Sequence, residues 1–301
     1  MTLVRAENRA LRTLVTGVVD YAGLFPPASL LMDVAVANYA AYRASDDAWM
    51  LGRFVVPVSR LDEWRGCVSR LDADAQSAWS GARLSALLSG EFAREAEQID
   101  AFNDRAPFGV QIDVAEGRVM SPDAVLAMAA AMPDAVTLYC EVPHRDDPAA
   151  MLQAVQSAGV CAKIRTGGVT PDAFPTPGEI VRFLRRCFEF GVTAKATAGL
   201  HHPLRGDYRL TYAPDAIRGT MYGYLNVFLA AAAVGAGFAD DVATSILLTT
   251  DDVHFGDDVV RVAGVSLSAA ALESVRAVGV VAFGSCSFRE PVDELTSLLL
   301  S

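Results

Sequence analysis

The chain alternates between short β-type runs and amphipathic helical runs along almost its whole length. The β-type runs are apolar and rich in β-branched residues, and a helical run follows each one after a turn or a helix-capping residue. Strands that are connected by helices pair in parallel, and eight such units close naturally into a barrel. The predicted strands lie at 17–25, 53–59, 82–90, 108–117, 135–143, 160–168, 192–200 and 279–287.

The sequence therefore predicts a single α/β domain, a (β/α)8 barrel that spans residues 1–301. No low-complexity linker divides the chain, and the regular spacing breaks only once, at about 200–276 between the seventh and eighth strands. Within this insertion, residues 251–268 predict a β-hairpin because Gly256 and Asp257 are favourable turn residues. The apolar run at 221–238 predicts a buried helix, since it is shorter than the roughly 20 residues of a membrane span.

Composition narrows the class of protein. The net charge of −11 argues against a nucleic-acid or anionic-membrane partner, because phosphate contacts need a basic surface. The five cysteines are odd in number and form no CxxC pair, which is typical of reduced thiols in a cytoplasmic protein. Charges throughout residues 1–15 give no sign of an apolar secretion signal.

Both lysines of the chain lie in the predicted sixth and seventh strands. Among the 25 lysine and arginine residues only Lys163 and Lys195 are lysines, and they occur in the similar phrases AKIRTGG and AKATAGL. The functional groups of such a barrel lie at the carboxyl ends of the strands, and both lysines precede a glycine-containing turn. A chain that otherwise uses arginine therefore has a chemical reason to keep an amine at these positions.

That chemistry is attack on a carbonyl. A neutral lysine amine forms a Schiff base, whereas arginine stays protonated and cannot. Free lysine has a pKa of about 10.4, so its surroundings must favour the neutral form. A dry barrel interior and a second cation on the adjacent strand, about 4.8 Å away, would both do so. The lysine pair thus indicates a Schiff-base enzyme.

The phrases AKIRTGG and FGVTAKATAGL resemble the sixth and seventh strands of the deoxyribose-phosphate aldolases, class I aldolases with a (β/α)8 barrel. The resemblance implies that Lys163 forms the Schiff base and that the charge of Lys195 favours its neutral amine. VVDYAGLFPPA, VQIDVA and LYCEV resemble three further strands of that family in the same order. They imply site roles for Asp20, for Asp113 as the proton-relay aspartate, and for Glu141. The phrases GLHHPLRG and AFGSCSFREPVDEL also resemble an uncharacterised bacterial barrel family.

Acid–base chemistry gives the same roles to the carboxylates. A retro-aldol reaction needs a base for a hydroxyl proton and an acid that protonates the enamine. Asp113 and Glu141 are predicted on neighbouring strands at the rim that carries the lysines, so either could serve. The alternative for each is an ion pair or a hydrogen-bonded strand end.

Arg165 departs from the aldolase pattern, which has a small hydroxyl residue at this place. It follows Lys163 by two residues and so shares its face of the strand. A planar guanidinium there suits a substrate carboxylate or phosphate, with a salt bridge to Glu141 as the alternative.

The turns after strands six to eight are the expected substrate-binding segments, and those after strands seven and eight often hold phosphate in such barrels. Glycine also occurs in such turns for backbone conformation alone. The candidate substrate-binding residues there are Gly167, Gly168, Gly199, His201, His202, Gly284 and Ser285.

Two alternative functions remain open from the sequence. Histidines and acids at the same rim could hold Zn²⁺ or Mn²⁺ for a hydrolase or lyase, although no HxH or HExxH spacing is present. The donors would come from His144, His201, His202, Cys286, Asp113 and Glu141. A non-catalytic barrel that acts as a binding or scaffold protein is the second alternative.

The preferred prediction is a cytoplasmic class I aldolase-like lyase that needs no cofactor and no metal. Its substrate is predicted to be a small carbonyl compound, phosphorylated or carboxylated. A homo-oligomer is compatible with the sequence.

Overall fold

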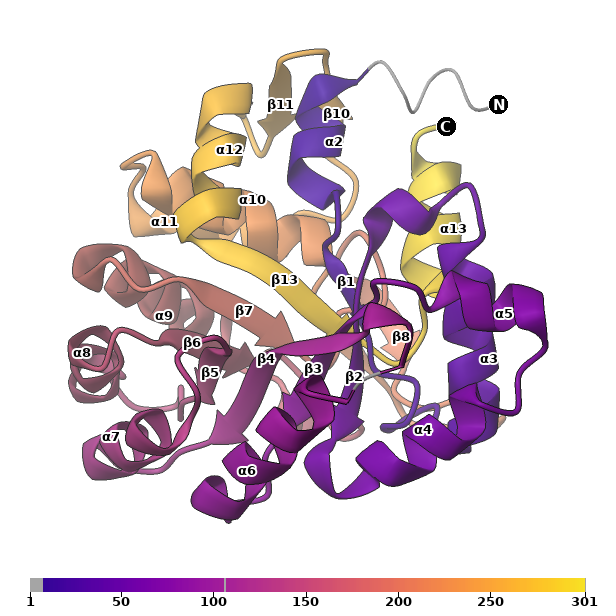
Figure 1. Cartoon of the computed structure of the whole chain (residues 1–301). Helices are drawn as coiled ribbons and strands as arrows, with labels where there is room; N and C mark the ends of the chain where they lie inside the picture. Colours follow the sequence, from indigo (N-terminus) through magenta and orange to yellow (C-terminus); the bar gives the residue numbers. More distant parts are fainter. Residues whose placement is uncertain (1–7, 106, 301) are drawn as a thin grey trace.

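The computed structural model describes residues 8–105 and 107–300, which form a closed barrel of parallel strands (Figure 1). The strand order around the barrel is β1-β13-β7-β6-β5-β4-β3-β2. This confirms the predicted fold class. The barrel strands are β1 Val19–Tyr21, β2 Leu51–Pro57, β3 Arg83–Leu87, β4 Gln111–Arg118, β5 Thr137–Glu141, β6 Cys161–Arg165, β7 Ala194–Thr197 and β13 Val280–Ser285.

Helices surround the barrel (Figure 1). They are α2 Arg9–Val15, α3 Met32–Arg43, α4 Leu61–Val68, α5 Ala73–Ala78, α6 Phe92–Asn103, α7 Pro122–Ala131, α8 Ala149–Ser157, α9 Pro177–Phe190, α10 Tyr224–Gly235, α11 Asp240–Leu248, α12 Ala269–Val278 and α13 Arg289–Leu298. Short 3₁₀ segments lie at Ala48–Met50, Val58–Arg60, Pro107–Gly109 and Pro171–Ala173.

Helix α9 connects the two lysine strands, and its sequence sets both of its ends. Thr176 and Glu179 form a capping box at its start, with Pro177 in the first turn. It ends at Gly191, whose φ of 63° lies in the left-handed region that favours glycine. The chain therefore enters β7 from a well-defined point.

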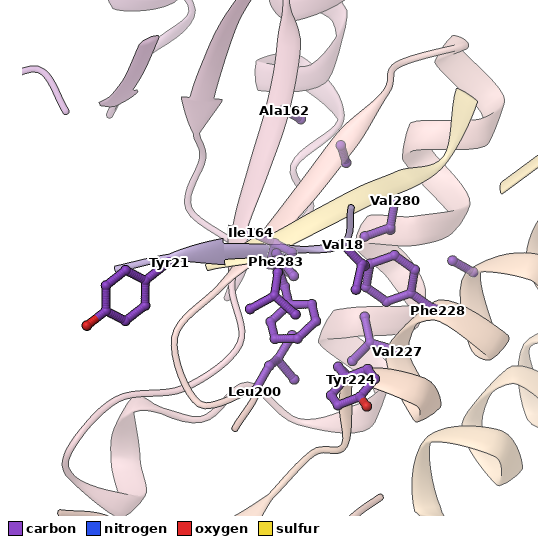
Figure 2. Close-up of a cluster of buried hydrophobic side chains, with 14 of the residues drawn as sticks. Val18, Tyr21, Ala162, Ile164, Leu200, Tyr224, Val227, Phe228, Val280 and Phe283 are labelled. Carbon is purple, nitrogen blue, oxygen red and sulfur yellow. The ribbon is translucent and has the colours of Figure 1, made fainter. Parts of the chain in front are cut away.

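The predicted buried helix at 221–238 is confirmed as α10, whose residues Tyr224 to Val234 are all buried. Figure 2 shows Tyr224, Val227 and Phe228 gathered beside Phe283 of β13. The rings of Tyr224 and Phe283 stack with centroids 4.9 Å apart. Among the described residues, no helix is both long enough and apolar enough to cross a membrane.

The segment between β7 and β13 carries more strand structure than one hairpin. Strands β8 Gly206–Arg209 and β9 Arg218–Met221 pair with each other in a two-stranded sheet that is separate from the barrel sheet. At the predicted hairpin, β10 Val253–Phe255, β11 Val259–Val262 and β12 Val265–Ser268 form a three-stranded antiparallel sheet. The third strand exists because Ala263 and Gly264, both with positive φ, make a second tight turn.

Candidate active site

The barrel places the two lysines side by side. Lys163 in β6 is the register partner of Lys195 in β7, so the two side chains start at the same height. Their neighbours Ala162, Ile164 and Ala196 are fully buried, in keeping with the alternation of faces along a strand. Lys163 is 5% exposed and Lys195 2%, which makes both unusually buried for lysine.

A single carboxylate connects the two amines. Glu116, near the end of β4, accepts from Lys163 Nζ at 2.9 Å through Oε2 and from Lys195 Nζ at 2.5 Å through Oε1. Ser85 Oγ of β3 donates to the same Oε1 at 2.5 Å. Glu116 is 3% exposed and is therefore held almost entirely by these three side chains.

Two further acids complete the cluster. Asp20 of β1 accepts from Lys195 Nζ at 2.5 Å and from the backbone N–H of Arg53 at 2.7 Å. Glu141, the last residue of β5, lies 2.9 Å from Lys163 Nζ. The structure thus brings Asp20 and Glu141 to the lysines, as the aldolase resemblance implies.

The electrostatics differ from the sequence expectation of two cations that act directly on each other. Burial alone raises the pKa of a carboxyl group, but Lys163 and Lys195 outweigh it and hold the pKa of Glu116 well below its usual range. Burial disfavours a charged Lys195, yet Asp20 and Glu116 raise its pKa above the ordinary value. The physical reason is that a buried cation needs an opposite charge in contact with it, so Glu116 lies between the two amines.

The structure does not bring Asp113 to the lysines. Its carboxylate forms a two-pronged ion pair with Arg53 at 2.7 and 2.9 Å, and its side chain is 30% exposed. Asp113 lies three residues before Glu116 and so nearer the amino end of β4. The β3 register moves there from Ile112 to Val114, a bulge that leaves Asp113 without a β3 partner.

Glu116 and Ser85 are the residues that sequence reasoning missed. The motif VQIDVA indicates Asp113 as the acid of this strand. The strand continues beyond the motif, through Glu116 to Arg118. The signal available in the sequence was an acidic residue later in the same strand, closer to the carboxyl edge where such sites lie. The bulge that sets its direction is not visible in the sequence.

A cavity of about 290 Å³ opens onto this cluster. Lys163, Lys195 and Glu116 reach it together with Arg165, His201 and Cys286. Its apolar wall is formed by Phe25, Pro26, Pro27, Val55, Leu87 and Val169. A concave site with an apolar wall and converging polar groups fits a small ligand.

The predicted glycines divide into two groups. Gly168, Gly199 and Gly284 line the cavity. Gly167 does not, and instead packs against Gly199: a Cβ added to either would lie 2.9 Å from the other's Cα. This contact between the turns after β6 and β7 requires glycine at both positions. Ser285 is buried, and its hydroxyl accepts from the Ser287 N–H at 3.3 Å.

Arg165 makes the salt bridge to Glu141 that was the alternative from the sequence, and it also lines the cavity. Its Nε contacts Glu141 Oε1 at 3.2 Å, while the side chain stays 48% exposed and lines the cavity. Its terminal nitrogens make no hydrogen bond within residues 8–105 and 107–300. Arg165 can therefore hold Glu141 and still present its outer edge to an anion.

The histidines do not converge. His201 Nδ1 lies 3.8 Å from Cys286 Sγ and 3.4 Å from Glu290 Oε2. His202 instead pairs with Glu294 at 2.8 Å and stacks on Tyr208. In the part of the chain that the structure describes, no group of three or more His, Cys, Asp or Glu side chains could hold a metal ion.

No protein-family model matches this chain, and no curated protein matches it. Among solved structures it is similar to the crystal structure of the Bacillus cereus spore cortex-lytic enzyme SleL. The identity is 10%, the alignment covers 95% of this chain and 74% of that chain, and the TM-score is 0.41. A similarity at this level carries no argument about activity, so the aldolase resemblance rests on the motif residues.

Proposed function

We propose that this protein is a class I aldolase-like lyase in which Lys163 forms a Schiff base with a small anionic carbonyl compound. The observation that carries the proposal is the buried Lys163 amine at a 290 Å³ cavity, joined to Lys195 through Glu116. A buried amine at a cavity, with carboxylates in contact that can accept its proton, supports this proposal.

The reaction begins with loss of a proton from Lys163. Glu141 and Glu116 both contact the amine at 2.9 Å, so either carboxylate can take that proton directly. The neutral amine then adds to the carbonyl carbon, and loss of water gives the iminium ion. Lys195 keeps its proton throughout, because Asp20 and Glu116 raise its pKa.

Arg165 couples substrate binding to this proton transfer. Burial raises the pKa of Glu141, but the charges of Lys163 and Arg165 outweigh it and lower that pKa. An anionic group that binds the Arg165 guanidinium partly neutralises the positive charge next to Glu141. The pKa of Glu141 then rises. The carboxylate then becomes a better base at the moment when substrate is present.

Carbon–carbon cleavage follows from the iminium ion. The substrate's hydroxyl loses its proton as the bond breaks, the electron pair moves into the iminium group, and an enamine forms. The carboxylate, which has returned the lysine proton to the departing water, accepts this hydroxyl proton and passes it to the enamine carbon. Water then releases the product and restores the amine. These steps use no cofactor.

The size and charge of the cavity support the substrate class that we propose. A volume of about 290 Å³ suits a compound of a few carbons, and Arg165 is the cavity-lining group that selects for a carboxylate or phosphate. The five cysteines are free thiols, which supports the cytoplasm as the compartment that we propose.

Borohydride trapping tests the proposal. Pyruvate and glyceraldehyde 3-phosphate, one carboxylated and one phosphorylated probe, should become fixed to the peptide that contains Lys163. Lys163→Arg keeps the charge but cannot form an imine, so the label should vanish. Lys195→Arg is the matched control and should retain the label. A label on Lys195 in the unaltered protein would contradict the assignment, and so would a label that survives in Lys163→Arg.

A further inference from the structure

A second group of reactive side chains lies at the cavity, and the Schiff-base chemistry does not use it. Cys286 follows β13 and His201 follows β7, two strands that are neighbours in the barrel. Both residues line the cavity that contains Lys163. Cys286 Sγ lies 3.8 Å from His201 Nδ1, within the range of a sulfur hydrogen bond.

Two residues from outside the barrel strands hold this pair. Glu290, in the first turn of α13, places Oε2 3.4 Å from His201 Nδ1. Tyr212 of the β8–β9 connection donates to Glu290 at 2.9 Å and lies 3.6 Å from Cys286 Sγ. Burial disfavours a charged His201, but the contacts with Cys286 and Glu290 raise the pKa of the imidazole to about 9.

This arrangement is that of an activated nucleophile. A thiol becomes strongly nucleophilic when an adjacent base takes its proton and a third group orients the base. The sulfur and Glu290 both approach Nδ1 of His201, and Glu290 stabilises its imidazolium form. The imidazolium is the proton donor, and it becomes the base for the thiol once it has given up that proton. Cys161 offers a contrast, because it is partly exposed and burial raises the pKa of its thiol. Within residues 8–105 and 107–300, no imidazole contacts its sulfur.

We infer that Cys286 and His201 form a second nucleophilic centre that adds reversibly to an aldehyde in the cavity. The sulfur bonds to the carbonyl carbon, the imidazolium of His201 gives its proton to the carbonyl oxygen, and the resulting imidazole accepts the proton that the thiol loses. The product is a thiohemiacetal, and reversal of the same steps releases the aldehyde. The addition needs no oxidant or reductant, and it goes beyond the proposed function because no lysine takes part.

Alkylation with iodoacetamide tests the nucleophile. At pH 7, Cys286 should react about 10-fold or more faster than Cys161, as measured by peptide mapping. His201→Asn should abolish most of this difference, and since asparagine is smaller than histidine, lower reactivity would not reflect blocked access. Equal rates at Cys286 and Cys161, or an unchanged rate in His201→Asn, would overturn the inference.

Aldehyde capture is tested separately with propanal. Propanal should protect Cys286 from iodoacetamide in Lys163→Arg, in which no Schiff base can form. Since this variant alters a buried charge cluster, the folded wild-type protein gives a second measurement. Carbon-13 at the propanal carbonyl should show a thiohemiacetal signal by NMR that Cys286→Ser abolishes. Absence of that signal, or protection that requires Lys163, would overturn aldehyde capture while leaving the Schiff-base proposal intact.

Discussion

Replacement of Glu116 by glutamine tests whether the ion cluster is a balanced unit. The cluster contains three acids, which are Asp20, Glu116 and Glu141. It also contains three cations, which are the buried Lys163 and Lys195 and, at its edge, Arg165. These six groups have no net charge when all are ionised. Glu116→Gln keeps the size of the side chain but leaves both amines without their shared carboxylate.

The expected cost is large because both partners are buried. Removal of one member of a buried ion pair destabilises a protein by about 3–5 kcal/mol, since an uncompensated charge remains inside. Asp113→Asn is the matched control, an acid-to-amide change on the same strand. Asp113 and Arg53 are each about one-third exposed, so loss of that pair should cost only about 1 kcal/mol.

Urea unfolding followed by circular dichroism at pH 7 measures both variants. Glu116→Gln should show the lower midpoint by a wide margin. The native pKa of Glu116 lies below its ordinary value of 4.5, so the carboxylate's contribution is complete above that pH and declines as pH falls below it. The difference in urea midpoint between Glu116→Gln and the wild type should therefore become smaller at acid pH. A Glu116→Gln midpoint equal to that of Asp113→Asn would refute the balanced-cluster reasoning.

Three further predictions concern the cavity and its rim. Arg165→Lys should raise KM for an anionic carbonyl substrate about 10-fold and leave neutral aldehydes nearly unaffected in the same assay, because lysine lacks the guanidinium fork. Gly199→Ala should destabilise by more than Gly81→Ala: both glycines have positive φ, but an added Cβ meets other atoms only at Gly199. Equal urea midpoints would contradict this. Glu290→Gln should destabilise most below pH 6.5, with the difference lost as pH rises toward 9, because the native pKa of His201 is raised. A difference that grows with pH would reverse that assignment.

The site residues differ in how far sequence reasoning could reach them. Lys163 and Lys195 stand out because the chain otherwise uses arginine, and their strands were predicted from local patterns. Glu141 follows from its place at the end of a strand. Glu116 was missed because its direction depends on a bulge against β3, a long-range pairing that local sequence does not encode.

The Cys286–His201 pair depends even more strongly on long-range contacts that local sequence does not encode. The two residues are 85 positions apart and meet because β7 and β13 are neighbours in the closed barrel. The group that packs beside them, Tyr212, comes from a connection between two short strands outside the barrel sheet. Sequence reasoning placed His201 at the rim but had no means to select its partner from among the acids and thiols nearby.

The sequence by itself determined the alternation of strands and helices, the parallel barrel, and the position of both lysines on adjacent strands. Apolar periodicity and helix-capping residues are local signals, so they can be recognised one segment at a time. Only the tertiary structure decided that Glu116 joins the two amines and that Asp113 pairs with Arg53 instead. It also decided which residues surround the Cys286 thiol. Charges buried in a barrel must find partners across strands, and that choice depends on register, bulges and closure that only the folded chain defines.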